Sequence, residues 1–154
     1  MERKPNTQYV LSISYGKDSL ACLGAIEKLG LPLDRIVHAE VWATQDIPAD
    51  LPPMVEFKKK ADKIILDRWG IQVEHFCAVK RERERERHLM MRWAGGSSER
   101  LSYKDIFYRV RKNNLQICGF PTHNVNWCTG ELKNAAIKAV SKSFPHCPRT
   151  QGAR

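Results

Sequence analysis

The sequence predicts an α/β fold in which helices flank a parallel β-sheet, and three observations support this prediction. Segments with strand and helix character alternate through residues 9–76, in the order strand, helix, strand, helix, strand. The first strand segment, Tyr9–Ser14, mixes β-branched and large apolar residues, which is typical of a buried strand. Each helix segment stops at a glycine, Gly30 or Gly70. Strands joined through a helix pair in parallel by right-handed crossovers, so these elements predict one wrapped sheet.

The spacing of apolar residues sets the expected bounds of each element. Strands are expected at residues 9–14, 36–42 and 71–76. Ser19–Leu29 is apolar on most of its faces and is expected to form a buried helix. The second helix is expected to begin at Pro52-Pro53, because proline suits a first helical turn, and to end at Trp69. Within it, apolar side chains recur at helical spacing at Met54, Phe57, Ala61, Ile64 and Ile65.

The second half of the chain is less regular. Arginine and glutamate alternate through residues 81–87, which neither a helix nor a strand can bury cheaply, so a solvated, charged insertion is expected over about 80–102. The remaining elements are expected to be a short basic helix at 103–112, a short strand at 116–120 and a helix at 131–140. Residues 143–154 contain two prolines and no periodicity, which predicts an irregular or disordered tail.

Composition limits the class of protein. A length of 154 residues with 42% apolar and 28% charged residues suits one globular domain and excludes wholesale disorder. No apolar stretch approaches the roughly 20 residues that span a bilayer, and no signal-peptide pattern is present, so a cytoplasmic protein without membrane contact is expected. The five cysteines form no C-x-x-C pair, which predicts reduced thiols and no iron–sulfur cluster.

Positive charge is concentrated in the second half of the chain. Residues 1–52 carry 5 basic and 7 acidic side chains, whereas residues 89–154 carry 11 basic and 3 acidic ones. The difference favours a polyanionic partner, either a nucleotide or a nucleic acid, and a merely solvated basic surface is the alternative.

The segment Ser-Tyr-Gly-Lys-Asp-Ser at residues 14–19 joins the first strand to the first helix. A helix N-terminus offers unpaired N–H groups and a positive dipole end. We expect Gly16 to allow a tight turn, Ser14 and Ser19 to add hydroxyl groups, and Lys17 to add a positive charge. Together they predict a phosphate cradle at the carboxyl end of a parallel strand. The alternative is a plain helix start in which Asp18 or Ser19 is the N-cap.

This loop resembles a known family. Residues 14–19 resemble the S-G-G-K-D-S signature of the PP-loop adenine-nucleotide superfamily, with Tyr15 in place of the first glycine. Trp127–Lys133 resembles the W-C-T-x-x-L-K stretch of its phosphoadenosine phosphosulfate (PAPS) reductase branch, and Gly119–Pro121 resembles the G-x-P just upstream. The resemblance covers about residues 8–142 and implies a PP-loop adenine-nucleotide-binding domain over 1–142. The implied fold is three-layered and Rossmann-like, of the HUP type.

The resemblance implies that an adenine nucleotide, either ATP or a PAPS-like nucleotide, lies across the edge of the sheet. Its phosphates or sulfate would contact Ser14, Tyr15, Gly16, Lys17, Asp18 and Ser19. Ala43 and Thr44, after the second strand, would line the adenosine pocket. Lys17 and Lys133 would neutralise charge as a bond at the α-phosphate breaks, and Asp18 would help to hold Mg²⁺ in ATP-using members. The implied reaction is adenylylation or sulfur-group transfer.

The chain also departs from the PAPS reductases. It has no E-C-G-x-H motif, and it keeps the Lys17-Asp18 pair that many reductases have lost, which favours ATP. Asn126 stands where the family often has arginine. Relatives continue beyond the W-C-T-x-x-L-K helix with another strand, so an early stop or a minimal version of the domain is expected, and whether this chain is active stays open.

Cys128 is the candidate catalytic thiol, because it lies near a predicted helix N-terminus with Lys133 nearby. The alternative is a cysteine that only packs beside Trp127. A reactive Cys128 would suit thiol-dependent reduction of PAPS or adenylyl sulfate. A further alternative is an RNA-binding or tRNA-modifying module that uses the basic second half. The acceptor substrate and the oligomeric state, a homodimer included, stay open.

Overall fold

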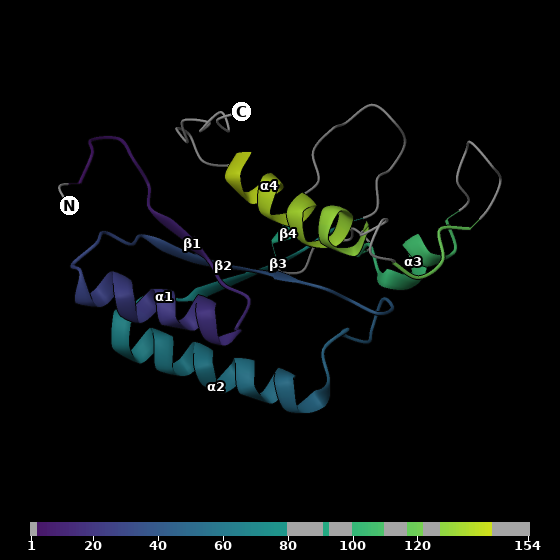
Figure 1. Cartoon of the computed structure of the whole chain (residues 1–154), viewed down its shortest axis with the longest axis horizontal. Coiled ribbons are helices and arrows are strands. Elements are labelled where there is room, and N and C mark those ends of the chain that lie inside the picture. The colour runs from purple at the N-terminus through teal and green to yellow at the C-terminus, as the bar shows by residue number, and fades with distance from the viewer. Residues whose placement is uncertain (1–2, 80–90, 93–99, 110–116, 122–126, 143–154) are drawn as a thin grey trace.

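The computed structural model describes residues 3–79, 91–92, 100–109, 117–121 and 127–142 (Figure 1). Its sheet holds four strands in the order β1-β2-β3-β4. The strands are β1 (Val10–Ser12), β2 (Arg35–Glu40), β3 (Val73–Cys77) and β4 (Met91–Arg92). The first three strands are parallel, and β4 runs antiparallel to β3. The predicted α/β fold with a parallel sheet flanked by helices is therefore confirmed.

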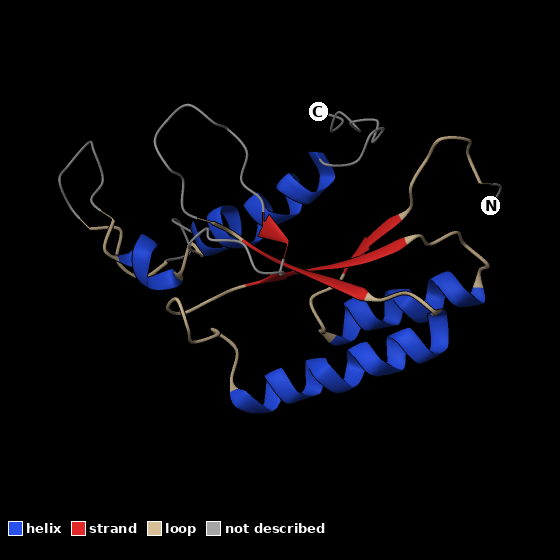
Figure 2. Ribbon diagram, turned by 180° about the vertical axis from the view of Figure 1, so that it is seen from behind, coloured by secondary structure: helices blue, strands red, loops and turns tan. Residues whose placement is uncertain are grey.

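The helices cover both faces of the sheet. Helices α1 (Lys17–Lys28) and α2 (Pro52–Trp69) lie on one face, as Figures 1 and 2 show. Helix α4 (Ala135–Lys142) lies on the other face, against β2 and β3. The chain therefore forms three layers in the part that the structure describes.

The ends of the first two helices follow from backbone chemistry. Helix α1 begins two residues earlier than predicted, because Gly16 is its N-cap and Asp18 and Ser19 lie inside its first turn. Helix α2 begins at Pro52, where the missing N–H of proline removes no hydrogen bond. It ends at Gly70, whose φ of 66° is left-handed, a conformation that glycine adopts without steric cost.

The core is divided by the sheet. On the side of α1 and α2, the buried cluster is made of Ile13, Tyr15, Leu23, Ile36, Ala61, Ile65 and Val73. On the opposite side, Val37 and Phe76 pack with Val140 of α4. Successive side chains of a strand point to opposite faces, so neighbours such as Ile36 and Val37 enter different clusters.

The second half of the chain differs most from the expected elements. Helix α3 (Tyr103–Phe107) is shorter than the predicted 103–112, of which 110–112 lie outside the described residues. Ser102 caps it, accepting from the N–H of Asp105, while the Asp105 carboxylate accepts from the N–H of Ser102. Residues 117–121 form no strand. The predicted helix at 131–140 is confirmed over 135–140, which lie in α4, whereas residues 131–134 belong to a π-helix, η1 (Cys128–Asn134), that continues into α4.

Two expectations fall largely outside the described residues. The expected insertion at about 80–102 includes β4 and residues 100–102, and its Arg-Glu run is not described. The expected tail at 143–154 is not described either. Among the described residues, no helix has the length and apolar character that crossing a membrane requires.

Candidate functional site

The loop between β1 and α1 carries the first motif. Tyr15 adopts the left-handed conformation at φ 60°, whereas Gly16 is extended at φ −73° and ψ 157°. The expectation that Gly16 makes the tight turn is therefore wrong, and the left-handed residue stands where the resembling signature has its first glycine. A Cβ added to Gly16 would lie 3.5 Å from Ser14 Oγ, an ordinary contact. Ser19 Oγ accepts from the N–H of Ser14 over 3.2 Å and donates to the Gly16 carbonyl over 2.9 Å.

A cavity of about 390 Å³, which we call the first cavity, opens beside this loop. It brings together three predicted site residues from distant parts of the chain, Ser14, Cys128 and Lys133. The other lining residues are Ser12, Ile13, His38, Ala39, Val41, Ala49, Asp50, Lys58, Tyr103 and Ile137. Small-molecule sites in proteins are typically about 300–1,000 Å³. With two lysines against one aspartate and several apolar side chains in its lining, the cavity suits a ligand that has an anionic part and an apolar part.

The second motif reaches this cavity from the π-helix. Leu132 is 1% exposed and packs with Ala78, Ile106 and Trp127, which anchors the helix on the sheet. Lys133, the next residue, is exposed and lines the cavity. A π-helix is rare and is often found at functional sites, because its wider turn re-aims side chains.

Several predicted residues lie next to the cavity and do not line it. Gly16, Lys17, Asp18 and Ser19 form the cap and first turn of α1. The side chains of Lys17 and Asp18 are exposed. Tyr15 is only 3% exposed and lies beneath the loop.

The loop after β2 contributes different residues from those predicted. Ala43 donates its N–H to the Ile47 carbonyl over 2.8 Å, and its carbonyl accepts from the N–H of Lys104 over 3.1 Å. Thr44 Oγ1 accepts from the N–H of Ile47 over 3.2 Å. Ala43 and Thr44 thus hold the loop and the start of α3 in place. The residues from this segment that line the first cavity are Val41, Ala49 and Asp50.

Sequence reasoning missed a buried lysine in the cavity wall. Lys58 of α2 is 8% exposed, and its Nζ lies 2.5 Å from Asp50 Oδ2 and 2.9 Å from His38 Nε2. His38 Nδ1 lies 2.8 Å from the Ile13 carbonyl, so the neutral ring donates at Nδ1 and accepts from Lys58 at Nε2. Burial, together with the positive charge of Lys58, lowers the pKa of His38 to about 4. An ammonium group carries three N–H donors, so Lys58 retains one beyond these two contacts.

A signal for Lys58 was present in the sequence. Lys58 precedes Ala61 and Ile65 at helical spacing, and these three are the buried residues of α2. A charged residue at such a position is seldom buried without a partner. The partners, Asp50 and His38, come from other segments and could not be identified from spacing.

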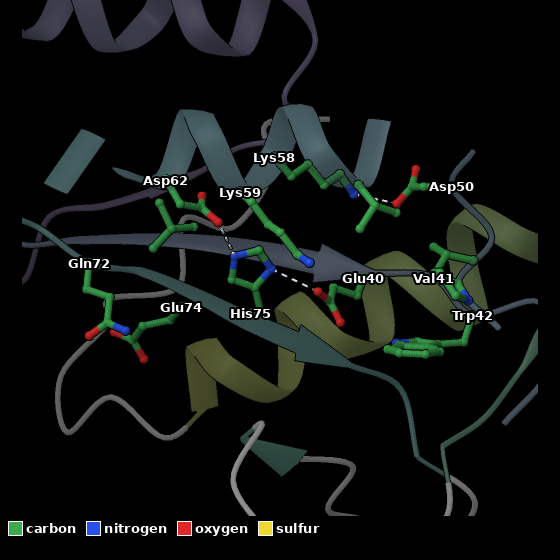
Figure 3. Close-up of a pocket in the computed structure, with 13 residues that line it drawn as sticks. Glu40, Val41, Trp42, Asp50, Lys58, Lys59, Asp62, Gln72, Glu74 and His75 are labelled. Atoms are coloured by element: carbon green, nitrogen blue, oxygen red, sulfur yellow. Dashed lines mark hydrogen bonds and ion pairs between the residues drawn. The ribbon is translucent and has the colours of Figure 1, made fainter. Parts of the chain in front are cut away.

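A larger cavity of about 650 Å³, the second cavity, is drawn in Figure 3 with its lining residues. The two cavities share Val41, Asp50 and Lys58 as lining residues. In the second, His75 of β3 lies between Asp62 and Glu40, at 3.0 Å from Asp62 Oδ2 and 2.9 Å from Glu40 Oε1.

The two carboxylates determine the charge of His75. Burial alone would lower the pKa of His75, but its bonds to Asp62 and Glu40 outweigh burial and raise the pKa to about 9. Burial alone would raise the pKa of Glu40, yet its contact with His75 leaves that pKa below the ordinary value. The Tyr15 hydroxyl donates to Asp62, and burial together with that carboxylate raises the pKa of Tyr15, which keeps the phenol neutral.

The part of the chain that the structure describes contains no cluster of three or more His, Cys, Asp or Glu side chains suited to a metal ion. The role of Asp18 toward Mg²⁺ stays a prediction. The basic second half, predicted to meet a polyanion, is described only in part.

Comparison with protein-family models, with curated proteins and with solved structures returned no match for this chain. The resemblance to the PAPS reductase branch therefore rests on the two motifs alone. It stays a prediction, and the spatial arrangement of those motifs carries the functional case.

Proposed function

We propose that this chain is an adenine-nucleotide-binding enzyme of the PP-loop, PAPS reductase-like type, built on a HUP-type Rossmann-like domain. It acts at the α-phosphate of ATP or of a related adenylyl nucleotide, by adenylylation or sulfur-group transfer. The nucleotide is its main partner, and Mg²⁺ accompanies ATP.

One observation carries the proposal: Ser14 of the first motif and Lys133 of the second line the same cavity although 118 residues separate them in the sequence. Lys58 also lines that cavity, where its charge is paired with that of Asp50. Two motifs that merely recurred by chance would have no reason to meet. Open α/β sheets usually bind ligands in this position, outside the carboxyl ends of their strands.

The residues suit chemistry at a phosphate. Lys58 and Lys133 would offset the negative charge that grows as the bond between the α-phosphate and its leaving group breaks. The Ser14 hydroxyl and the N–H groups of the first turn of α1 would orient the phosphate chain. Lys17, which is exposed at that turn, would reach a phosphate group that extends beyond the cavity.

The proposal is tested by the affinity for ATP and Mg²⁺ in calorimetry, followed by ATP–pyrophosphate exchange. Lys133→Ala and Lys17→Ala should each weaken ATP binding by about tenfold or more, since a hydrogen bond to a charged group contributes about 1.5–3 kcal/mol. Lys28→Ala is the matched control, because Lys28 is the last residue of α1 and Lys17 the first. Absence of ATP binding, or equal losses in all three variants, would contradict the proposal.

A second candidate is thiol-dependent reduction of PAPS or adenylyl sulfate, which the presence of Cys128 in the lining of the first cavity favours. The Cys128 thiolate would attack the sulfur of the sulfate group and expel the nucleotide, and a dithiol such as reduced thioredoxin would then supply two electrons and release sulfite. Cys128→Ser should abolish sulfite release, whereas Cys22→Ser, exposed on α1, should not. Release that persists in Cys128→Ser would exclude this candidate.

A further inference from the structure

Tyr15 has a backbone conformation that its side chain disfavours. Its φ of 60° is left-handed, and a bulky residue in this region is strained by roughly 1–2 kcal/mol. Glycine adopts the same conformation freely. A tyrosine at this position therefore needs a compensating interaction through its side chain.

The hydroxyl group of Tyr15 lies in a cluster of ion-paired side chains formed by Asp62, His75 and Glu40. It donates to Asp62 of α2, and its oxygen lies 3.3 Å from His75 Nε2 of β3. His75 contacts Asp62 through Nε2 and Glu40 of β2 through Nδ1, both within 3.0 Å. The loop is thereby connected to α2 directly, and to β3 and β2 through His75 and Glu40.

The ring of Tyr15 makes further contacts on the side of the first cavity. It meets His38 edge to face, with ring centroids 4.8 Å apart, and Lys58 Nζ lies 5.5 Å from its centroid. His38 in turn contacts the Ile13 carbonyl over 2.8 Å. The residues on both sides of Ser14, Ile13 and Tyr15, are therefore tied to the core.

We propose that Tyr15 is a positioning residue. Its phenol fastens the loop between β1 and α1 to α2 and β3, and so holds Ser14 at the first cavity. A glycine at this position would relieve the backbone strain and leave the loop without this fastening. The anchoring concerns the ligand-free chain, and only its consequence for nucleotide affinity rests on the proposed function.

The test compares hydrogen exchange of the backbone amides of residues 14–19 in the ligand-free chain. Tyr15→Phe keeps the ring and removes the hydroxyl, and Tyr15→Gly introduces the residue that the resembling signature has at this position. Both should speed exchange in the loop by about tenfold, as expected for loss of a hydrogen bond to a charged group, with β3 and the end of α1 unchanged. Tyr9→Phe is the matched control, because its hydroxyl lies at the other end of β1 and contacts the exposed N–H of Lys4.

A second variant keeps the test valid if Tyr15→Phe does not fold. Asp62→Asn retains the volume of the side chain and removes its charge, so it should also speed loop exchange and should lower the pKa of His75. Unchanged loop exchange in whichever of the two variants folds, or slower exchange in Tyr15→Gly, would overturn the proposal.

Measuring the ATP affinity of the wild type and of the Tyr15 variants separates this proposal from the proposed nucleotide function. Faster loop exchange with ATP affinity lowered about tenfold supports both. Faster loop exchange in a chain whose wild type binds no ATP leaves Tyr15 as the anchor and removes the proposed nucleotide function.

Discussion

The first and second cavities each contain a histidine, and the two histidines take opposite charge states. His38 and His75 are direct partners in the register of β2 and β3, and their ring centroids are 5.4 Å apart. His38 faces the cation Lys58, and burial and that charge lower its pKa to about 4. His75 faces Asp62 and Glu40, which outweigh its burial and raise its pKa to about 9.

The contrast shows that burial is the main reason His38 is neutral, whereas charged partners override burial at His75. Burial lowers the pKa of both rings; at His38 the charge of Lys58 adds to burial, whereas at His75 the two carboxylates outweigh it. The lining of the first cavity carries Lys58 and Lys133 against Asp50, an excess of one positive charge, while its histidine is neutral. Such a wall suits an anionic ligand, whereas the charge of the second cavity is largely compensated within the His75 cluster.

The largest expected effect comes from the lysine that both cavities share. Lys58→Met keeps most of the side-chain volume and removes the charge that pairs with Asp50, so it should lower the free energy of unfolding by about 2–3 kcal/mol. It should also raise the pKa of His38, because a neighbouring positive charge is lost. Urea denaturation measures the first effect and NMR titration the second.

Lys59→Met is the control for this variant, since Lys59 is the adjacent residue of α2 and is exposed. Its effect on stability should stay within about 0.5 kcal/mol. Equal losses of unfolding free energy in Lys58→Met and Lys59→Met would mean that the buried contacts of Lys58 do not stabilise the fold.

A medium effect concerns the pH dependence of stability. His75 has a pKa of about 9 when folded, above the ordinary 6.5, so its contribution is fully present below about pH 6.5 and is lost as pH rises through 9. His38 has a pKa of about 4 when folded, so it destabilises the fold as pH falls from 6.5 toward 4. The two rings face each other, and Tyr15 and the charge of Glu40 act on both. Asp62 also faces His75, and Lys58 also faces His38.

Thermal unfolding across pH 4–10 should follow these two trends. His75→Gln should flatten the alkaline limb, and His38→Gln should flatten the acid limb. NMR titration measures the pKa of each ring directly. Similar pKa values for His38 and His75 would contradict the opposite charge states described for them.

The smallest effect is expected at the loop that borders the first cavity. Gly16→Ala should change the free energy of unfolding by no more than about 0.5 kcal/mol, because φ is −73° and the new Cβ meets only Ser14 Oγ at 3.5 Å. Thermal denaturation measures it, with Gly70→Ala as the contrast, since φ at Gly70 is 66° and alanine would be strained there. A larger loss at Gly16 than at Gly70 would contradict this description of the loop.

Much of the fold could be predicted from local patterns. The alternation of elements and the glycine stops placed α1, α2 and the three parallel strands within a few residues. These signals are local, because apolar spacing and end residues act within one element. The helix predicted at 131–140 is confirmed over 135–140, but nothing in its spacing distinguishes the π-helix at Cys128–Asn134 from an α-helix.

The candidate site could be predicted only in part. Ser14, Cys128 and Lys133 stood out as members of motifs, and the structure brings them to one cavity. Lys58 and His75 lie in a helix and a strand that the sequence predicts, but they belong to no motif, and their partners could not be predicted. Their environments depend on side chains from other elements, which no single segment reveals.

The sequence by itself determined the order of the elements, the glycine that ends α2 and the residue types at the loop, because each follows from chemistry within a few neighbouring residues. The tertiary structure alone decided that Tyr15 takes the left-handed position and that Lys58 is buried. It also decided that His38 is neutral while His75 is charged. These properties arise from charges and hydrogen-bond partners that only the packing of α2 against the sheet brings within reach.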